Sequence, residues 1–256
     1  MSMRVLPPHI VVSGLPDGER PHAFSLILQL SELETQRRRF ETGLALMDFC
    51  LGQIASAQQI RDAAASLDPN GPLEKLAAWP RAFEQYQTAI ELPLAWKDLA
   101  IRDCAICVWD FRQAIGGVHS RLSACPTFKA WVASAEFEGA RARLNEYFPA
   151  KETKAIRYAF THSADLMKSP GIMKGNASVQ PIKTDRLDVR AGGSNFIKHT
   201  SGRECSITVH GKLHTFRLDQ QTLDRLTEVR DMTYAAFGPV GFKSREAMIE
   251  RAHHRS

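Results

Sequence analysis

The sequence is poor in cysteine and contains no long apolar run. Its 256 residues include 5 cysteines, an odd number in a chain that is not short, and this argues against a regular disulfide framework. No stretch approaches the ~20 apolar residues of a membrane-spanning helix. The N-terminus up to Pro16 lacks the apolar core and the small-residue cleavage site of a signal peptide. We therefore expect a cytoplasmic protein without membrane contact.

The charge of the chain indicates which kinds of binding partner it favours. Charged residues make up 24% of the chain and apolar residues 44%, as in ordinary globular proteins. The net charge is +5 and the isoelectric point about 9.0, which favours an anionic partner over a cationic one but also simply keeps a protein soluble. The length is enough for a full core in one or two domains.

The apolar periodicity predicts a mainly α protein. Apolar residues recur at helical spacing in six stretches, with turn residues such as those of Asp68–Pro72 between them. We expect Thr127 and Asp219 to cap helices, Pro93 to begin one and Gly238-Pro239 to close the last. The predicted helices cover residues 25–67, 73–91, 94–123, 127–147, 150–168 and 219–237.

Three short apolar runs punctuated by glycine predict an antiparallel β-meander at about residues 193–218. The expected fold is thus a helical bundle of five or six helices with a small antiparallel β-meander near the C-terminus. Residues 1–24 would form an irregular N-terminal arm and residues 25–240 a single helical domain that includes the meander. Residues 241–256 would form a basic C-terminal tail.

Several residues that suggest chemistry have a simpler structural interpretation. Cys104 and Cys107 form a CxxC pair inside an apolar helical run, with no second pair to complete a zinc site, so we expect buried thiols. The basic run Arg37–Arg39 is typical of a solvated helix face. Strand alternation would divide the potential ligands of the meander between two faces, and we expect neither a metal nor a cofactor. Those ligands are His199, Cys205, His210 and His214.

The strongest candidate is Arg157 with His162, five positions later in a helical pattern. It combines a permanent cation with the side chain that titrates near neutral pH. Tyr158 and Asp165 lie within one turn of His162, where an aspartate would orient the imidazole. On a helical wheel these polar residues occupy one half of the helix. The other half contains Ile156, Phe160 and Met167, which we expect to be buried.

These residues suit metal-independent cleavage of RNA. That reaction needs a base for the 2′-hydroxyl, an acid for the leaving oxygen and a cation for the charge that develops on phosphorus. His162 is the candidate base or acid and Arg157 the candidate cation, while Lys151, Lys154 and Lys168 would attract the RNA backbone. The same spacing also fits a solvated helix face without chemistry.

The run Arg157-Tyr-Ala-Phe-Thr-His162 resembles the motif of the HEPN superfamily, helical bundles with an arginine, four to six residues and a histidine on a late helix. The resemblance implies a homodimeric endoribonuclease with a toxin or defence role and with Arg157 and His162 as the catalytic pair. Tyr158 stands where many members have a small polar residue. Other members are inactive, so the alternative is a non-catalytic protein-interaction or RNA-binding module.

Overall fold

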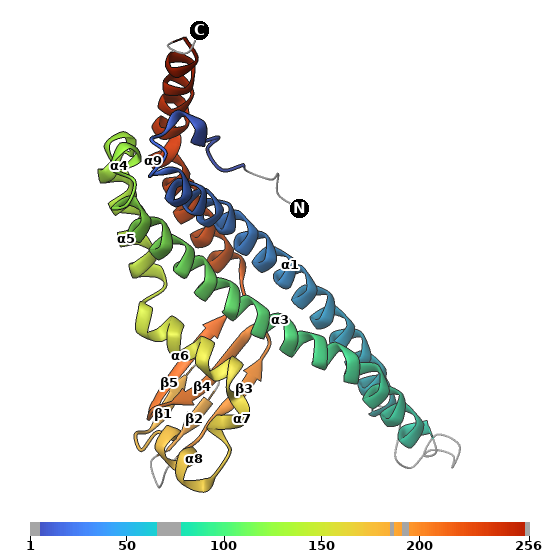
Figure 1. Cartoon of the computed structure of the whole chain (residues 1–256). Coiled ribbons are helices and arrows are strands. Elements are labelled where there is room, and N and C mark those ends of the chain that lie inside the picture. The colour runs from blue at the N-terminus through green and yellow to red at the C-terminus, as the bar shows by residue number, and fades with distance from the viewer. Residues whose placement is uncertain (1–5, 66–77, 185–186, 191–194, 254–256) are drawn as a thin grey trace.

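The computed structural model describes residues 6–65, 78–184, 187–190 and 195–253. Two long helices, α1 (Arg20–Ala65) and α3 (Ala78–Leu122), run antiparallel as a hairpin whose outer end stands away from the rest of the molecule (Figure 1). The predicted turn at Asp68–Pro72 lies outside the described residues. The chain is mainly helical with a small antiparallel sheet near its C-terminus, as the sequence predicts.

A third long helix, α9 (Gln220–His253), packs against the inner half of the hairpin (Figure 1). Two shorter helices, α4 (Pro126–Trp131) and α5 (Ser134–Tyr147), complete this layer, and the 3₁₀ turn η1 (Val12–Gly14) lies on α9. The main core forms between them and includes the fully enclosed rings of Phe40, Phe111, Phe128, Phe137 and Phe237.

The sheet consists of β3 (Lys198–Ser201), β4 (Glu204–Val209) and β5 (Lys212–Arg217) in antiparallel order, which confirms the predicted meander. Helix α6 (Ala150–Thr161) packs on β4 and β5. The chain between α6 and the sheet forms two short helices and a hairpin. The first short helix lies within the helix expected at 150–168, and the other elements lie where no helix or strand was predicted. These elements are α7 (Ser163–Leu166), α8 (Pro170–Asn176), β1 (Ile182–Thr184) and β2 (Leu187–Val189).

The described part of the chain has eight α-helices rather than five or six, and their boundaries correct several predictions. Pro93 does not begin a helix but lies inside α3, so the two helices expected at 73–91 and 94–123 are one. Proline removes a single helical hydrogen bond, and Pro93 is itself buried, between the buried Ile90 and Lys97, in a helix that packs extensively against α1. The helix expected at 127–147 is divided into α4 and α5. Thr127, expected as the cap, lies inside the first turn of α4, whose N-cap is Cys125. Asp219 does cap α9, since its carboxylate accepts the backbone N–H of Thr222 at 2.8 Å.

Gly238-Pro239 does not close the last helix. Helix α9 continues through Pro239 to His253, so most of the expected C-terminal tail is helical. The N-terminal segment supports this extension: the Ser244 hydroxyl accepts the backbone N–H of Val11 at 3.0 Å, and Arg251 donates to the carbonyl of Leu15 at 2.6 Å. These long-range contacts are invisible to a local reading of Gly238-Pro239.

The basic run at Arg37–Arg39 is not wholly solvated, because Arg37 is buried. Its guanidinium donates to Glu34 at 3.0 Å and to Glu41 at 3.1 Å, and Glu34 also receives Arg230 of α9. Burial alone would raise the pKa of Glu34, but hydrogen bonds from the two arginines lower it below the usual value. The buried charges therefore compensate one another across two helices.

Candidate functional site

Helix α6 ends four residues after Arg157, at Thr161, so His162 lies at the junction with α7 rather than on a continuous helix. The Thr161 hydroxyl donates back to the carbonyl of Arg157 at 2.9 Å, and the His162 N–H makes the closing bond to Tyr158 at 2.8 Å. The expectation of one helix over 150–168 is therefore wrong beyond Thr161. As a result Met167, expected in the core, is 47% exposed.

The burial predicted from the helical wheel is partly confirmed for the other residues. Ile156 and Phe160 are partly buried and pack against the main core rather than being enclosed by it. Arg157 and His162 are partly exposed and Asp165 is exposed, as expected.

His162 has two neighbours that orient its ring. Its Nδ1 lies 3.2 Å from Oδ2 of Asp165, and its ring stacks on Tyr158 with centroids 4.9 Å apart and planes at 28°. Both contacts were expected from the spacing of the three residues. They leave Nε2 as the ring nitrogen that Asp165 does not engage, and His162 is 43% exposed, so a substrate atom can reach the imidazole.

A second imidazole meets the same tyrosine. His210 also stacks with Tyr158, with centroids 6.3 Å apart and planes at 20°. The separation of the two imidazole centroids can therefore be no larger than the sum of these two centroid distances. His162 and His210 come from different elements, and Tyr158 brings them together on one surface.

The backbone at His210 is built for this position. His210 and Gly211 form the two-residue turn between β4 and β5, with φ of 50° and 75°, both in the left-handed region. Asn176 of α8 holds the turn: its side-chain oxygen accepts the N–H of His210 at 3.2 Å, and its carbonyl accepts the N–H of Gly211 at 3.3 Å. Asn176 is itself buried. The imidazole is thus presented by a turn that a third element fixes.

A third histidine lies beside the pair. His214 on β5 is half-buried, and burial lowers its pKa, although Glu152 on α6 opposes that shift. Lys212 and His210 contribute to the lowering, which shows that all three lie close enough to interact. The described residues include no group of three or more His, Cys, Asp or Glu arranged to hold a metal ion.

The positive charge of Arg157 acts on Asp110 of α3. Burial raises the pKa of Asp110 on α3, and the positive charges of Arg39 and Arg157 oppose that rise. Arg157 makes no side-chain hydrogen bond or ion pair within the described ranges, whereas His162 engages Tyr158 and Asp165. No hydrogen bond or ion pair joins the two predicted catalytic residues in the described part of the chain.

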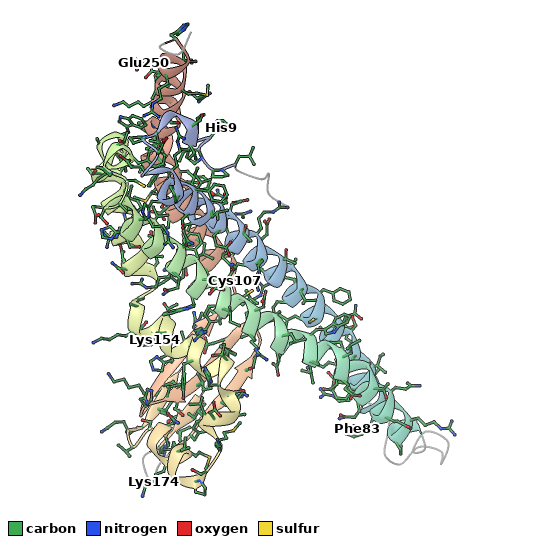
Figure 2. The ribbon with its side chains drawn as sticks, in the orientation of Figure 1. His9, Phe83, Cys107, Lys154, Lys174 and Glu250 are labelled. Atoms are coloured by element: carbon green, nitrogen blue, oxygen red, sulfur yellow. The ribbon has the colours of Figure 1, made fainter. Side chains whose placement is uncertain are left out.

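The predicted RNA-binding lysines are exposed. Lys151 and Lys154 lie on α6 and Lys168 follows α7, and Lys154 projects outward from the helix (Figure 2). Lys212 adds a further exposed cation next to the turn at His210. The surface around the imidazoles therefore has several positive charges and suits an anionic substrate.

The sequence pattern suggests His210 only as a potential metal ligand and gives Asn176 no role. A His-Gly pair between two alternating runs is a hairpin signal, but it does not indicate which element the imidazole meets. No local pattern indicates that Asn176, 34 positions earlier, holds that turn.

Comparison of the chain with protein-family models, curated proteins and solved structures finds no match. Among the helices of the described residues, none has the length and apolarity needed to cross a membrane.

Proposed function

We propose that the protein is a metal-independent endoribonuclease whose centre is formed by His162, Tyr158 and His210. The observation that carries the proposal is the stacking of one tyrosine with two imidazoles from separate elements, at 4.9 and 6.3 Å. Two imidazoles on a basic surface supply both proton-transfer groups that RNA cleavage requires without a metal.

The chemistry assigns one role to each histidine. His162 removes the proton of the 2′-hydroxyl, the 2′-oxygen attacks phosphorus, and the bond to the 5′-oxygen breaks as His210 donates a proton to that oxygen. The products are a 2′,3′-cyclic phosphate and a 5′-hydroxyl. Asp165, 3.2 Å from Nδ1 of His162, stabilises the imidazolium that forms.

The transition state also needs a cation near phosphorus. Lys212 fits this role because it pairs with Val209 across the turn at His210, on the face of the sheet next to α6. The HEPN resemblance assigns the role to Arg157, which in a homodimer would come from the second subunit. Replacing Lys212 and Arg157 separately by glutamine distinguishes the two assignments, because only the loss of the residue that stabilises the transition state lowers kcat strongly.

The test uses a labelled RNA oligonucleotide in the presence of EDTA. We expect His162→Ala to lower the cleavage rate by ~10²–10⁴. His210→Asn is expected to do the same while keeping the turn, because asparagine tolerates a left-handed backbone. The matched control is His119→Ala, which removes an exposed histidine that lies 3.9 Å from Glu138 at a different place. Cleavage that survives both site variants, or that stops on adding EDTA, contradicts the proposal.

The alternative, a non-catalytic RNA-binding or protein-interaction module, also has support. The outer half of the hairpin exposes large apolar side chains, including Phe49, Phe83 and Leu92. Neither module would cleave RNA. For an RNA-binding module, Lys151→Glu and Lys154→Glu weaken RNA binding in a fluorescence anisotropy titration. For a protein-interaction module, the protein binds no RNA in the same titration.

A further inference from the structure

A long groove runs along one side of the hairpin, away from the histidine site. It has a volume of about 870 Å³, lies between α1 and α3, and is also lined by Leu6 and Pro7 of the N-terminal segment. This volume lies in the range of small-molecule sites. Its two ends differ in chemistry.

One end is apolar. Gly43 lies in the floor, where a Cβ atom would overlap Sγ of Cys104, so the helices approach closely and leave an open channel above. Leu46 and Leu99 form the walls, and Leu99 is 56% exposed. Beyond Leu99 the apolar surface continues over Trp96, one turn earlier on α3, and Phe49, whose ring centroid lies 6.4 Å from that of Trp96.

The other end has one uncompensated positive charge. Glu34 is bound to Arg37 and Arg230, and Asp103 accepts from Arg39 at 2.5 Å, so these groove charges are neutralised. Arg38 also lines the groove, and within the described residues its guanidinium has no carboxylate partner. Positions 38 and 49 of one helix are separated by about 17 Å at 1.5 Å per residue.

We propose that this groove binds a long-chain carboxylate, with its head group on Arg38 and its hydrocarbon chain over Leu46, Leu99 and Trp96. The unpaired charge at Arg38 selects an anion, and beyond Arg39 and Asp103, which neutralise one another, the groove is lined by Leu46 and Leu99. The separation of the two ends matches an extended hydrocarbon chain rather than a compact metabolite. Exposed apolar surface of this kind marks an interaction site.

The experiment titrates the full-length protein with dodecanoate below its micellar concentration and follows tryptophan fluorescence. Trp96→Phe identifies the part of the signal that comes from the groove. We expect saturable binding, with Kd falling about twofold to fourfold for each methylene added between decanoate and tetradecanoate. Dodecanol and dodecyltrimethylammonium are expected to bind at least tenfold more weakly.

Two matched pairs of variants test the placement. Arg38→Gln should weaken dodecanoate binding about tenfold, whereas Arg245→Gln, at an exposed arginine on α9, should not. Leu99→Asp should abolish binding, whereas Leu28→Asp, at a leucine with a similar exposure of 54%, should not. Equal affinity for the carboxylate and the alcohol, or equal effects within either pair, overturns the proposal. An absence of saturable binding also overturns it.

Discussion

Glu34 of α1 and Arg230 of α9 are 196 positions apart in the chain and form an ion pair that solvent scarcely reaches, with side-chain exposures of 5% and 4%. Arg37 approaches the same carboxylate from its own helix. The pair therefore connects the hairpin to α9 through charges that have lost their water.

Removing one member of this cluster should be costly. Glu34→Gln leaves Arg37 and Arg230 without their shared carboxylate, and we expect a loss of ~3–5 kcal/mol in the free energy of unfolding. The measurement is urea unfolding followed by circular dichroism. Asp103→Asn is the control, because its pair with Arg39 is about half exposed and should contribute only ~0–1 kcal/mol. Similar losses for the two variants would show that burial of Glu34 has no energetic consequence.

The same carboxylate should make stability depend on pH. The pKa of Glu34 is lowered in the folded state, so the folded protein binds fewer protons than the unfolded chain as pH falls through the acid range. The contribution is complete above the unfolded pKa of about 4.3 and is lost as pH falls through the folded value. The stability difference between wild type and Glu34→Gln should thus be largest at pH 6–7 and shrink below about pH 4. A difference that stays constant over this range would contradict the assignment.

Two glycines of α1 should respond oppositely to alanine. At Gly43 a Cβ would overlap Sγ of Cys104, so Gly43→Ala should cost ~1–3 kcal/mol. At Gly52 a Cβ meets nothing within 4 Å, and Gly52→Ala should stabilise the helix by ~0.5–1 kcal/mol. Thermal unfolding reports both changes. Adding Cys104→Ala to Gly43→Ala should recover most of the loss, and a failure to recover would place the strain elsewhere.

The buried thiols should not react in the native protein. Burial, reinforced by Asp103, raises the pKa of Cys107 to about 12, and burial also raises the pKa of Cys104. Because the thiolate is the reactive form, alkylation by iodoacetamide at pH 8 should be slow until the protein unfolds. Mass spectrometry of Cys104 and Cys107 along a urea gradient measures this. Rapid alkylation without urea would contradict their enclosure in the core.

The sequence predicts the mainly helical class, the meander and the Asp219 cap because each depends on nearby residues. It fails at Pro93 and Pro239, where packing against distant helices outweighs a local helix-breaking signal. It also fails at Arg37, since burial of that side chain requires Arg230 to share Glu34.

The site shows the same division. The contacts of His162 with Tyr158 and Asp165 follow from spacing along one segment and were expected. The approach of His210 was not, because it depends on how β4, β5 and α8 fold against α6. The electrostatic influence of Arg157 on Asp110 likewise depends on where α3 passes.

The hydrogen bonds that join Ser244 to Val11 and Arg251 to Leu15 have a consequence for synthesis on the ribosome. The chain emerges N-terminus first at about 5–20 residues per second. Arg230 is therefore synthesised roughly 10–40 s after Glu34, and the delay between the N-terminal segment and its partners is longer still. During that interval the hairpin can pair, but its buried charges and its apolar inner face have no cover. Nascent chains stalled before residue 230 should therefore be captured by a chaperone that binds exposed apolar surface, and full-length chains released from the ribosome should not.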